Sequence, residues 1–209
     1  GHRAGNYLIF FPSYVYLNEV LATFSVRFPQ FNTVYQTPAM DDAARTGFME
    51  MFETPGSEAE VQETLVGFAI MGGVFGEGID LKGNRLIGVV VVGVGLPQLG
   101  IERDLIKHYF DGELQLDDTR EPDKNHVTGT GFEFAYQYPG INRVLQTAGR
   151  LIRSESDRGI LCLVDNRFNE HRYRRLLPSH WKMEGVKSPA QLNRAIEGFW
   201  RGSDNPLRL

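Results

Sequence analysis

Short apolar runs bounded by glycine alternate along this chain with stretches of helical periodicity. The clearest runs are residues 65–71, 86–93 and 160–165, each of a length typical of a strand. Continuous apolar runs of this kind are typical of strands covered on both faces, as in a parallel sheet. Parallel strands are joined by right-handed crossovers, and helical patterns separate these runs. The sequence therefore predicts an α/β fold, a parallel sheet flanked by helices.

The remaining pattern completes this alternation. Further strands are predicted at residues 7–12 and 33–36, and helices at 14–27, 41–52, 99–110, 138–153, 170–176 and 190–200. Ser13 and Ser188 are the predicted N-caps of the first and last helices. Residues 111–130 break the pattern with acids, proline and glycine, which predicts an exposed excursion. We expect a tag remnant or linker at 1–4, one domain over 5–178, and a C-terminal extension with a docking helix over 179–209.

The composition excludes several classes of protein. Of the 209 residues 42% are hydrophobic and 23% charged, which is ordinary for a globular domain. No apolar run approaches the roughly 20 residues that cross a bilayer, and no signal peptide is visible. The low cysteine content suggests a reducing cytoplasm, and we expect a cytoplasmic monomer. Cys162 is the only cysteine, which excludes an internal disulfide and a cysteine-rich zinc site. We expect Cys162 to pack in the core, His108 and His171 to lie at the surface, and no metal site within the chain.

The charge is unevenly distributed. A net charge of −4 argues against indiscriminate binding of nucleic acid. However, residues 41–63 are acidic, whereas residues 143–182 are rich in arginine. This asymmetry allows one anion-facing surface on an acidic protein.

The arginine-rich segment contains a pattern suited to a polyphosphate. In a helix, Gln146, Arg150 and Arg153 recur at i, i+4 and i+7 and share one face, while an apolar series lies on another. Two planar, permanently charged guanidiniums one turn apart suit a polyphosphate better than a single carboxylate. A solvated basic helix face is the alternative interpretation.

Residues 72–83 form a glycine-rich segment between two predicted strands. Glycine lets a ligand approach the backbone and permits positive φ, so this segment predicts a loop that cradles phosphates or a nucleic-acid backbone. It matches neither G-x-G-x-x-G nor G-x-x-x-x-G-K-[ST], so both nucleotide-binding fingerprints fail. A glycine-rich turn with no ligand is the alternative.

Taken together, these segments resemble superfamily 2 DNA helicases of the XPD/DinG type. GEGIDLKG at residues 76–83 is similar to motif V, and Q-x-x-G-R-x-x-R-x-x-x-D-x-G at residues 146–159 is similar to motif VI. GNYLIFFPSY at residues 5–14 is similar to motif IV, and LVDNRF at residues 163–168 is closest to the bacterial DinG branch. The resemblance implies a RecA-like second motor domain.

The resemblance also implies roles for individual residues. ATP would bind between two motor domains, with Arg150 and Arg153 on its γ-phosphate and Gln146 giving polar support. From motif V, Glu77 and Asp80 would accept hydrogen bonds from the ribose or orient the arginines, although Asp80 as a turn cap is the alternative. Gly78, between them, would also belong to the nucleotide-binding site.

Single-stranded DNA would follow the strand ends, in the 5′ to 3′ direction. The residues expected at this groove are Ser13, Tyr14, Gly73 and Gly76. We expect the loops after Phe11 and Met71 and residues 152–154 to converge at one edge of the sheet, where parallel folds bind ligands.

Half of the catalytic machinery is absent from the sequence. There is no Gly-Lys dipeptide for a Walker A loop and no Asp-Glu pair for magnesium, both of which the family carries on its first motor domain. We therefore expect a fragment of a longer ATP- and magnesium-dependent DNA helicase, inactive alone and partnered by the first motor domain of the same polypeptide. An iron–sulfur cluster or a nuclease domain, where the full protein has one, would lie outside this chain. The alternatives are an RNA helicase of the same superfamily and a free-standing nucleic-acid-binding module without enzymatic activity.

Overall fold

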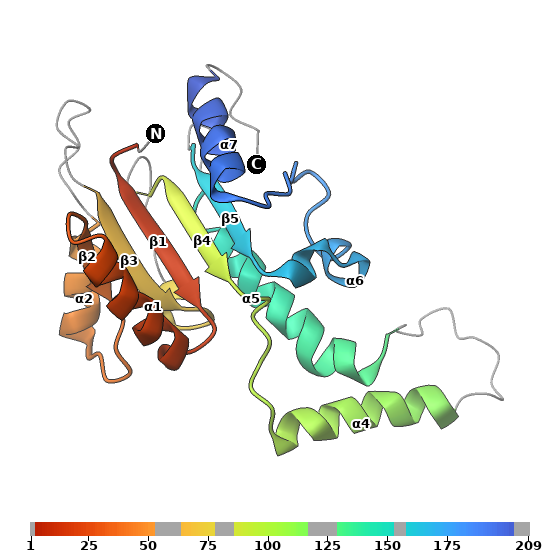
Figure 1. Cartoon of the computed structure of the whole chain (residues 1–209). Helices are drawn as coiled ribbons and strands as arrows, with labels where there is room; N and C mark the ends of the chain where they lie inside the picture. The colour runs from red at the N-terminus through yellow and green to blue at the C-terminus, as the bar shows by residue number, and fades with distance from the viewer. Residues whose placement is uncertain (1–2, 53–63, 78–85, 117–128, 153–157, 203–209) are drawn as a thin grey trace.

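The computed structural model contains one parallel sheet (Figure 1). It describes residues 3–52, 64–77, 86–116, 129–152 and 158–202, with side chains for all of these except Glu77 and residues 113–116. The strands are β1 (Asn6–Phe11), β2 (Asn32–Tyr35), β3 (Leu65–Ile70), β4 (Gly88–Val92) and β5 (Ile160–Val164). They lie in the order β2-β3-β1-β4-β5, and every neighbouring pair is parallel. The predicted α/β fold with a parallel sheet is therefore confirmed.

Helices connect the strands, and capping side chains mark the starts of α1, α2 and α7. The helical segments are α1 (Tyr14–Arg27), α2 (Asp42–Glu50), α3 (Val74–Glu77), α4 (Ile101–Leu116), the π-helical η2 (Glu133–Gln137), α5 (Tyr138–Ala148), the 3₁₀ segment η3 (Asn166–Asn169), α6 (His171–Arg174) and α7 (Pro189–Arg201). Ser13 accepts a hydrogen bond from the N–H of Tyr16, and Ser188 accepts one from the N–H of Gln191. Both predicted caps are confirmed. In the described parts of the chain no helix is both long enough and apolar enough to span a bilayer.

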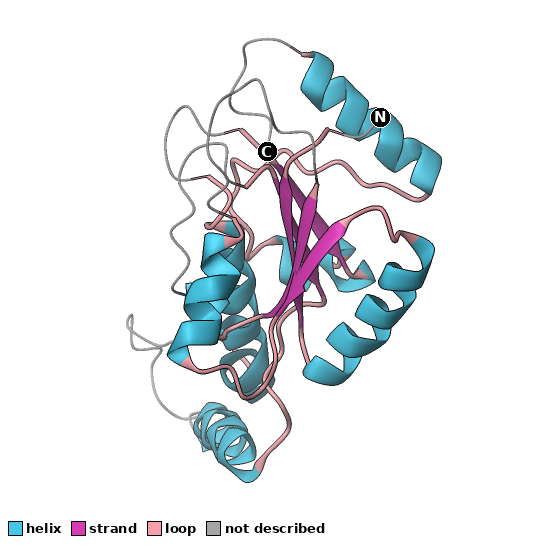
Figure 2. Ribbon diagram, turned by 90° about the vertical axis from the view of Figure 1, so that its left-hand side faces the viewer, coloured by secondary structure: helices cyan, strands magenta, loops and turns pink. Residues whose placement is uncertain are grey.

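Helices cover both faces of the sheet, which accounts for the continuous apolar strands. On one face α1 packs Leu17 and Phe24 against Phe11 and Phe68. On the other face α2, α3 and α5 contribute the buried side chains, which pack on the strand residues Phe10, Val89 and Val91. Figure 2 shows the sheet nearly edge-on between these two layers. Cys162, expected in the core, is half-buried on β5, and this burial raises the pKa of its thiol.

The motif VI helix ends earlier than predicted. α5 stops at Ala148, and the N–H groups of Arg150 and Leu151 bond the carbonyls three residues earlier, Thr147 and Ala148, as in a 3₁₀ turn. Glycine at the end of the helix lowers its helical propensity by about 1 kcal/mol relative to alanine. The prediction of a helix over residues 138–153 was therefore wrong for residues 149–152, and Arg150 does not lie on the α-helix itself; residue 153 lies outside the described part.

By contrast, α4 continues beyond its predicted end at residue 110 to Leu116. The carboxylate of Asp111 accepts a hydrogen bond from the N–H of Gly131 at 2.7 Å and pairs with Lys107 at 3.3 Å. The Gly131 hydrogen bond, followed by Lys107, lowers the pKa of Asp111 despite partial desolvation. Asp111, predicted to lie in an exposed excursion, therefore belongs to the helix and holds Gly131 against it. Residues 117–128 lie outside the described part.

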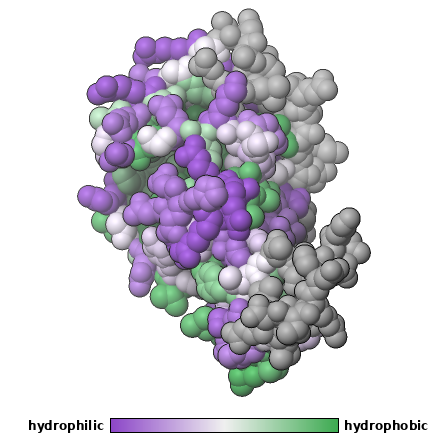
Figure 3. Space-filling view, turned by 90° about the vertical axis from the view of Figure 1, so that its right-hand side faces the viewer, coloured by the Kyte–Doolittle hydropathy of each residue, from purple (hydrophilic) through white to green (hydrophobic). Residues whose placement is uncertain are grey.

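α4 stands away from the sheet and rests on η2 (Figure 1). Phe110 stacks on Phe134 with ring centroids 4.1 Å apart, and the Tyr136 hydroxyl donates to Asp104 at 3.0 Å. The outer side of α4 is apolar: Leu105 and Tyr109 are 64% and 59% exposed. Figure 3 shows apolar side chains at the lower end of the molecule, below a largely hydrophilic middle.

Candidate functional site

Residues predicted to contact DNA meet at the carboxyl ends of β1, β2 and β3. Gln36, which follows β2, donates from its Nε2 to the Tyr14 hydroxyl at 3.0 Å. Its Oε1 accepts the N–H of Ile70 at 2.9 Å, just before the glycine loop. A Cβ added to Gly73 would lie 3.4 Å from Gln36 Nε2. The structure thus brings Tyr14 and Gly73 together through Gln36, a residue that sequence reasoning missed, and Ser13 precedes Tyr14 as the N-cap of α1.

Gly76 lies in a different place from these three residues. It is buried within α3, and its carbonyl accepts a hydrogen bond from Arg150 Nε at 2.9 Å. A Cβ at Gly76 would lie 3.8 Å from Thr147 Oγ1, so α3 approaches α5 closely here. The prediction grouped Gly76 with the DNA residues, but its backbone faces motif VI.

Arg150 is therefore held at the junction of α3 and α5. Its side chain is half-buried, and the Gly76 carbonyl accepts from its Nε. Gln146, one turn earlier on α5, is exposed. Beside them Thr147 is fully buried, and its hydroxyl has no hydrogen-bond partner in the described part of the chain. We call this group, Gly76, Gln146, Thr147 and Arg150, the motif V–VI junction.

The other predicted nucleotide residues fall outside what the structure describes. Arg153, Gly78 and Asp80 lie in residues 153–157 and 78–85. Glu77 is the last residue of α3, and its side chain is not described.

The predicted convergence of three segments at one edge is not seen for the third, of which only Ile152 is described and residues 153–154 lie outside the described part. The loops after Phe11 and Met71 do lie at the carboxyl edge, because β1 and β3 are parallel and in register. Leu151 lies at the opposite edge instead: a Cβ on Gly159, just before β5, would be 2.5 Å from its Cδ1. α5 begins beside the loop after β4 and runs back along the sheet, so Ile152 returns to the amino edge.

At the end of β5, Asp165 and Arg167 form a pair that serves the fold. Arg167 donates from Nε and an Nη to the two carboxylate oxygens of Asp165 at 3.0 and 2.8 Å, and its backbone N–H donates to the same carboxylate at 2.8 Å. The Arg167 side chain, more than its backbone N–H, lowers the pKa of Asp165 against the opposing effect of burial. The bidentate contact commits Arg167 to Asp165.

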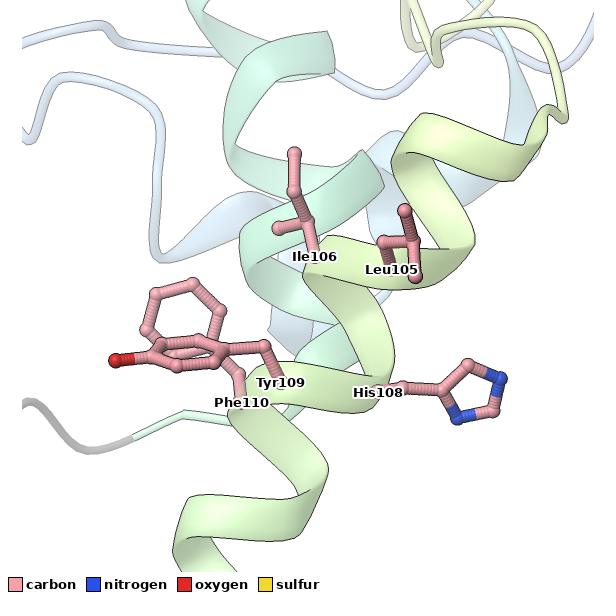
Figure 4. Close-up of a pocket in the computed structure, with 5 residues that line it drawn as sticks. All are labelled: Leu105, Ile106, His108, Tyr109 and Phe110. Carbon is pink, nitrogen blue, oxygen red and sulfur yellow. The ribbon is translucent and has the colours of Figure 1, made fainter.

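A shallow hollow on α4 contains none of the predicted site residues. It is lined by Leu105, Ile106, His108, Tyr109 and Phe110 (Figure 4). The rings of Tyr109 and Phe110 lie together, whereas His108 extends to the other side of the helix. His108 and His171 are exposed, as predicted.

Comparison with known proteins shows the family to which the chain belongs. Residues 2–184 match the helicase C-terminal domain family. The chain belongs to this family. This helicase C-terminal domain is 28% identical over 192 residues to the ATP-dependent DNA helicase CHL1 of Kluyveromyces lactis, covering 87% of the chain and 22% of that protein. It is also 28% identical over 188 residues to the regulator of telomere elongation helicase 1 of Bos taurus, covering 86% and 15%.

A solved structure of apo XPD shares the fold of the helicase C-terminal domain, with a TM-score of 0.53 and 21% identity over 82% of this chain and 30% of that one. The predicted RecA-like fold and the predicted helicase C-terminal domain are therefore confirmed, while the closeness to the DinG branch stays a prediction. The chain spans about a fifth of the length of the curated relatives it matches.

Proposed function

We propose that this domain is the second motor of an ATP-dependent DNA helicase. The first motor domain of the same polypeptide supplies the phosphate loop and the ligands of the ATP-bound magnesium ion. This chain supplies Arg150 and Arg153 from across the cleft. The observation that carries the proposal is the hydrogen bond from Arg150 to the Gly76 carbonyl, which joins motif V to motif VI.

The hydrogen bond to Gly76 explains how Arg150 would act. A main-chain carbonyl that accepts from Nε fixes the plane of the guanidinium before any nucleotide arrives. A cation oriented in advance stabilises charge that develops on the γ-phosphate without reorganisation during the reaction. Gln146, exposed one turn earlier, would give polar support at the same cleft. Glu77 and Asp80 would accept hydrogen bonds from the ribose or orient the two arginines, and Gly78 would lie between them at the nucleotide site.

Single-stranded DNA would follow the carboxyl edge of the sheet. Ser13 and Gly73 offer small residues where a backbone phosphate can approach, and Tyr14 offers a ring on which a base can stack. The hydrogen bonds of Gln36 hold Tyr14 against the glycine loop, so the ring is fixed in place. We further propose a monomeric, cytoplasmic enzyme, consistent with a single half-buried cysteine.

The test uses the full-length protein. Arg153→Ala and Arg150→Ala should each lower DNA-stimulated ATP hydrolysis by about 10³-fold or more, while nucleotide affinity changes little. Arg174→Ala removes an exposed arginine of α6 and should leave the rate unchanged. Folded Arg153→Ala and Arg150→Ala variants that hydrolyse ATP at the wild-type rate would contradict the assignment. The 209-residue chain alone should show no ATPase activity, whereas turnover by the pure chain would favour a self-sufficient enzyme.

A further inference from the structure

Arg143 is a cation at the carboxyl edge of the sheet with no role in the proposed chemistry. It lies on α5, and its Nη1 donates to the Gly95 carbonyl at 3.4 Å. Its side chain also crosses the glycine loop, because a Cβ added to Gly72 would lie only 3.0 Å from Arg143 Nε. Arg143 therefore spans the loops that follow β3 and β4.

Close backbone approaches place Arg143 between these loops. Gly72 and Gly95 adopt positive φ angles of 69° and 68°. A Cβ on Gly95 would lie 2.5 Å from the Gly140 carbonyl oxygen, and one on Gly140 would lie 2.7 Å from the Val94 oxygen. The start of α5 is thus seated directly on the loop after β4, which brings the next turn of the helix, with Arg143, to the strand ends.

The charge of Arg143 is not neutralised by the described part of the protein. None of the ion pairs among the described residues involves it. Among the described residues, its hydrogen bond to the Gly95 carbonyl is long and goes to a neutral group, and its side chain is half-exposed. A guanidinium presents a planar fork of donors that matches a phosphate group.

We infer that Arg143 binds a backbone phosphate of single-stranded DNA. The inference rests on the proposed function and extends the groove of Ser13, Tyr14 and Gly73 across the sheet to the loop after β4. It also gives α5 two roles. The helix carries a DNA contact near its first turn and leads into Arg150 at its other end, so DNA and nucleotide act on one rigid element.

The experiment measures binding of an oligothymidylate to the full-length protein across a range of salt concentrations. Arg143→Ala should weaken the affinity about tenfold, the loss expected for one charge-assisted hydrogen bond. The slope of log K against log salt should become less steep by about 0.7, the value for one single-strand phosphate contact. Arg27→Ala removes an equivalent charge from an exposed arginine at the far end of α1 and should change neither quantity. ATP affinity should be unchanged in both variants. If Arg143 instead bound the nucleotide phosphates, Arg143→Ala would weaken ATP binding.

A second measurement avoids dependence on a folded variant. Arginine-selective labelling of the wild-type protein with phenylglyoxal, read by mass spectrometry, should modify Arg143 and lose that modification when oligothymidylate is bound. An unchanged salt slope, or equal labelling of Arg143 with and without DNA, would overturn the inference. A wild-type protein with neither DNA binding nor DNA-stimulated ATPase would instead refute the proposed function.

Discussion

Gln36 completes the hydrogen bonding of β3 where β2 has already ended. β2 stops at Tyr35, and the backbone N–H of Gln36 makes the last ladder bond, to Phe68. The next available N–H, that of Ile70, is bonded by the side-chain oxygen of the same glutamine at 2.9 Å. The amide is only 8% exposed, so its removal leaves a shielded donor without a partner.

Gln36→Leu should lower the free energy of unfolding by about 1–2 kcal/mol, because Ile70 and Tyr14 lose their shared partner. Chemical denaturation of the 209-residue chain measures this. Gln30→Leu changes an exposed glutamine in the same way and should stay within about 0.5 kcal/mol of wild type. Equal stabilities of the two variants would show that the Gln36 hydrogen bonds contribute nothing net.

Asp165 should make stability depend on pH. Its pKa is lowered in the folded protein, mainly by hydrogen bonds from Arg167, so the pair stabilises the fold above the unfolded-state pKa of about 3.9. This stabilisation is lost as pH falls through the lowered folded-state pKa.

Asp165→Asn should therefore cost about 1 kcal/mol at pH 7, and its difference from wild type should shrink as the pH drops below about 4. Denaturation at a series of pH values measures the difference. Asp42→Asn breaks an ion pair with Arg45. Because the Asp42 side chain is 98% exposed, this change should have little effect on stability at any pH. A constant Asp165→Asn deficit from pH 7 to pH 3 would rule out the ion pair as its source.

At the scale of elements, capping residues and apolar spacing predicted the bounds of a helix correctly where no distant contact altered them. α1 begins at Tyr14 and ends at Arg27, as the Ser13 cap and the apolar spacing predict. α5 was overextended because the helical spacing of Gln146, Arg150 and Arg153 continues past Gly149 in the sequence, whereas the α-helix ends at Ala148. Gly149 ends the helix locally, but the contact that then holds Arg150 is distant in sequence, a hydrogen bond to the Gly76 carbonyl that no local pattern reveals.

The C-terminal helix α7 was predicted from its cap and periodicity, but its docking depends on Arg158. None of its residues is fully buried. Arg158 donates to the carbonyl oxygens of Phe199, at 2.7 Å, and Gly202, and its guanidinium lies 5.0 Å from the Phe199 ring. Arg3 stacks 4.2 Å over the Trp200 ring. Polar and cation–π contacts therefore replace a buried apolar face.

Arg158→Ala should release α7 while the sheet stays folded. Amide hydrogen exchange within α7 should become about tenfold faster or more, and that of β1 and β4 should not change. Arg194→Ala removes an exposed arginine from α7 itself and serves as the control. Unchanged exchange in α7 after Arg158→Ala would mean that its aromatic residues hold the helix without the arginine.

At the scale of the whole molecule, the structure separates two sites that the sequence placed at one edge. Motif order along the chain gives the family but not the direction in which each motif faces. A helix between parallel strands runs back along the sheet, so the end of α5 lies near Leu151 at the amino edge while Arg143 stays at the carboxyl edge. α5 thus connects the proposed DNA groove to the motif V–VI junction.

In the proposed function, DNA lies along the carboxyl edge of the sheet and α5 links it to the motif V–VI junction. The resemblance to XPD/DinG helicases implies that the motor moves from 5′ to 3′ along this strand. The full-length enzyme should unwind a duplex with a 5′ single-stranded overhang, since its motor must load on the strand along which it moves. A 3′ overhang of the same sequence should be unwound at least about tenfold more slowly, and binding to both should weaken as salt rises. Strand-displacement assays with the two substrates and an RNA counterpart make the comparison. Unwinding from the 3′ overhang alone would reverse the assigned polarity, and activity confined to RNA would favour an RNA helicase even with Arg150 and Arg153 in their proposed roles.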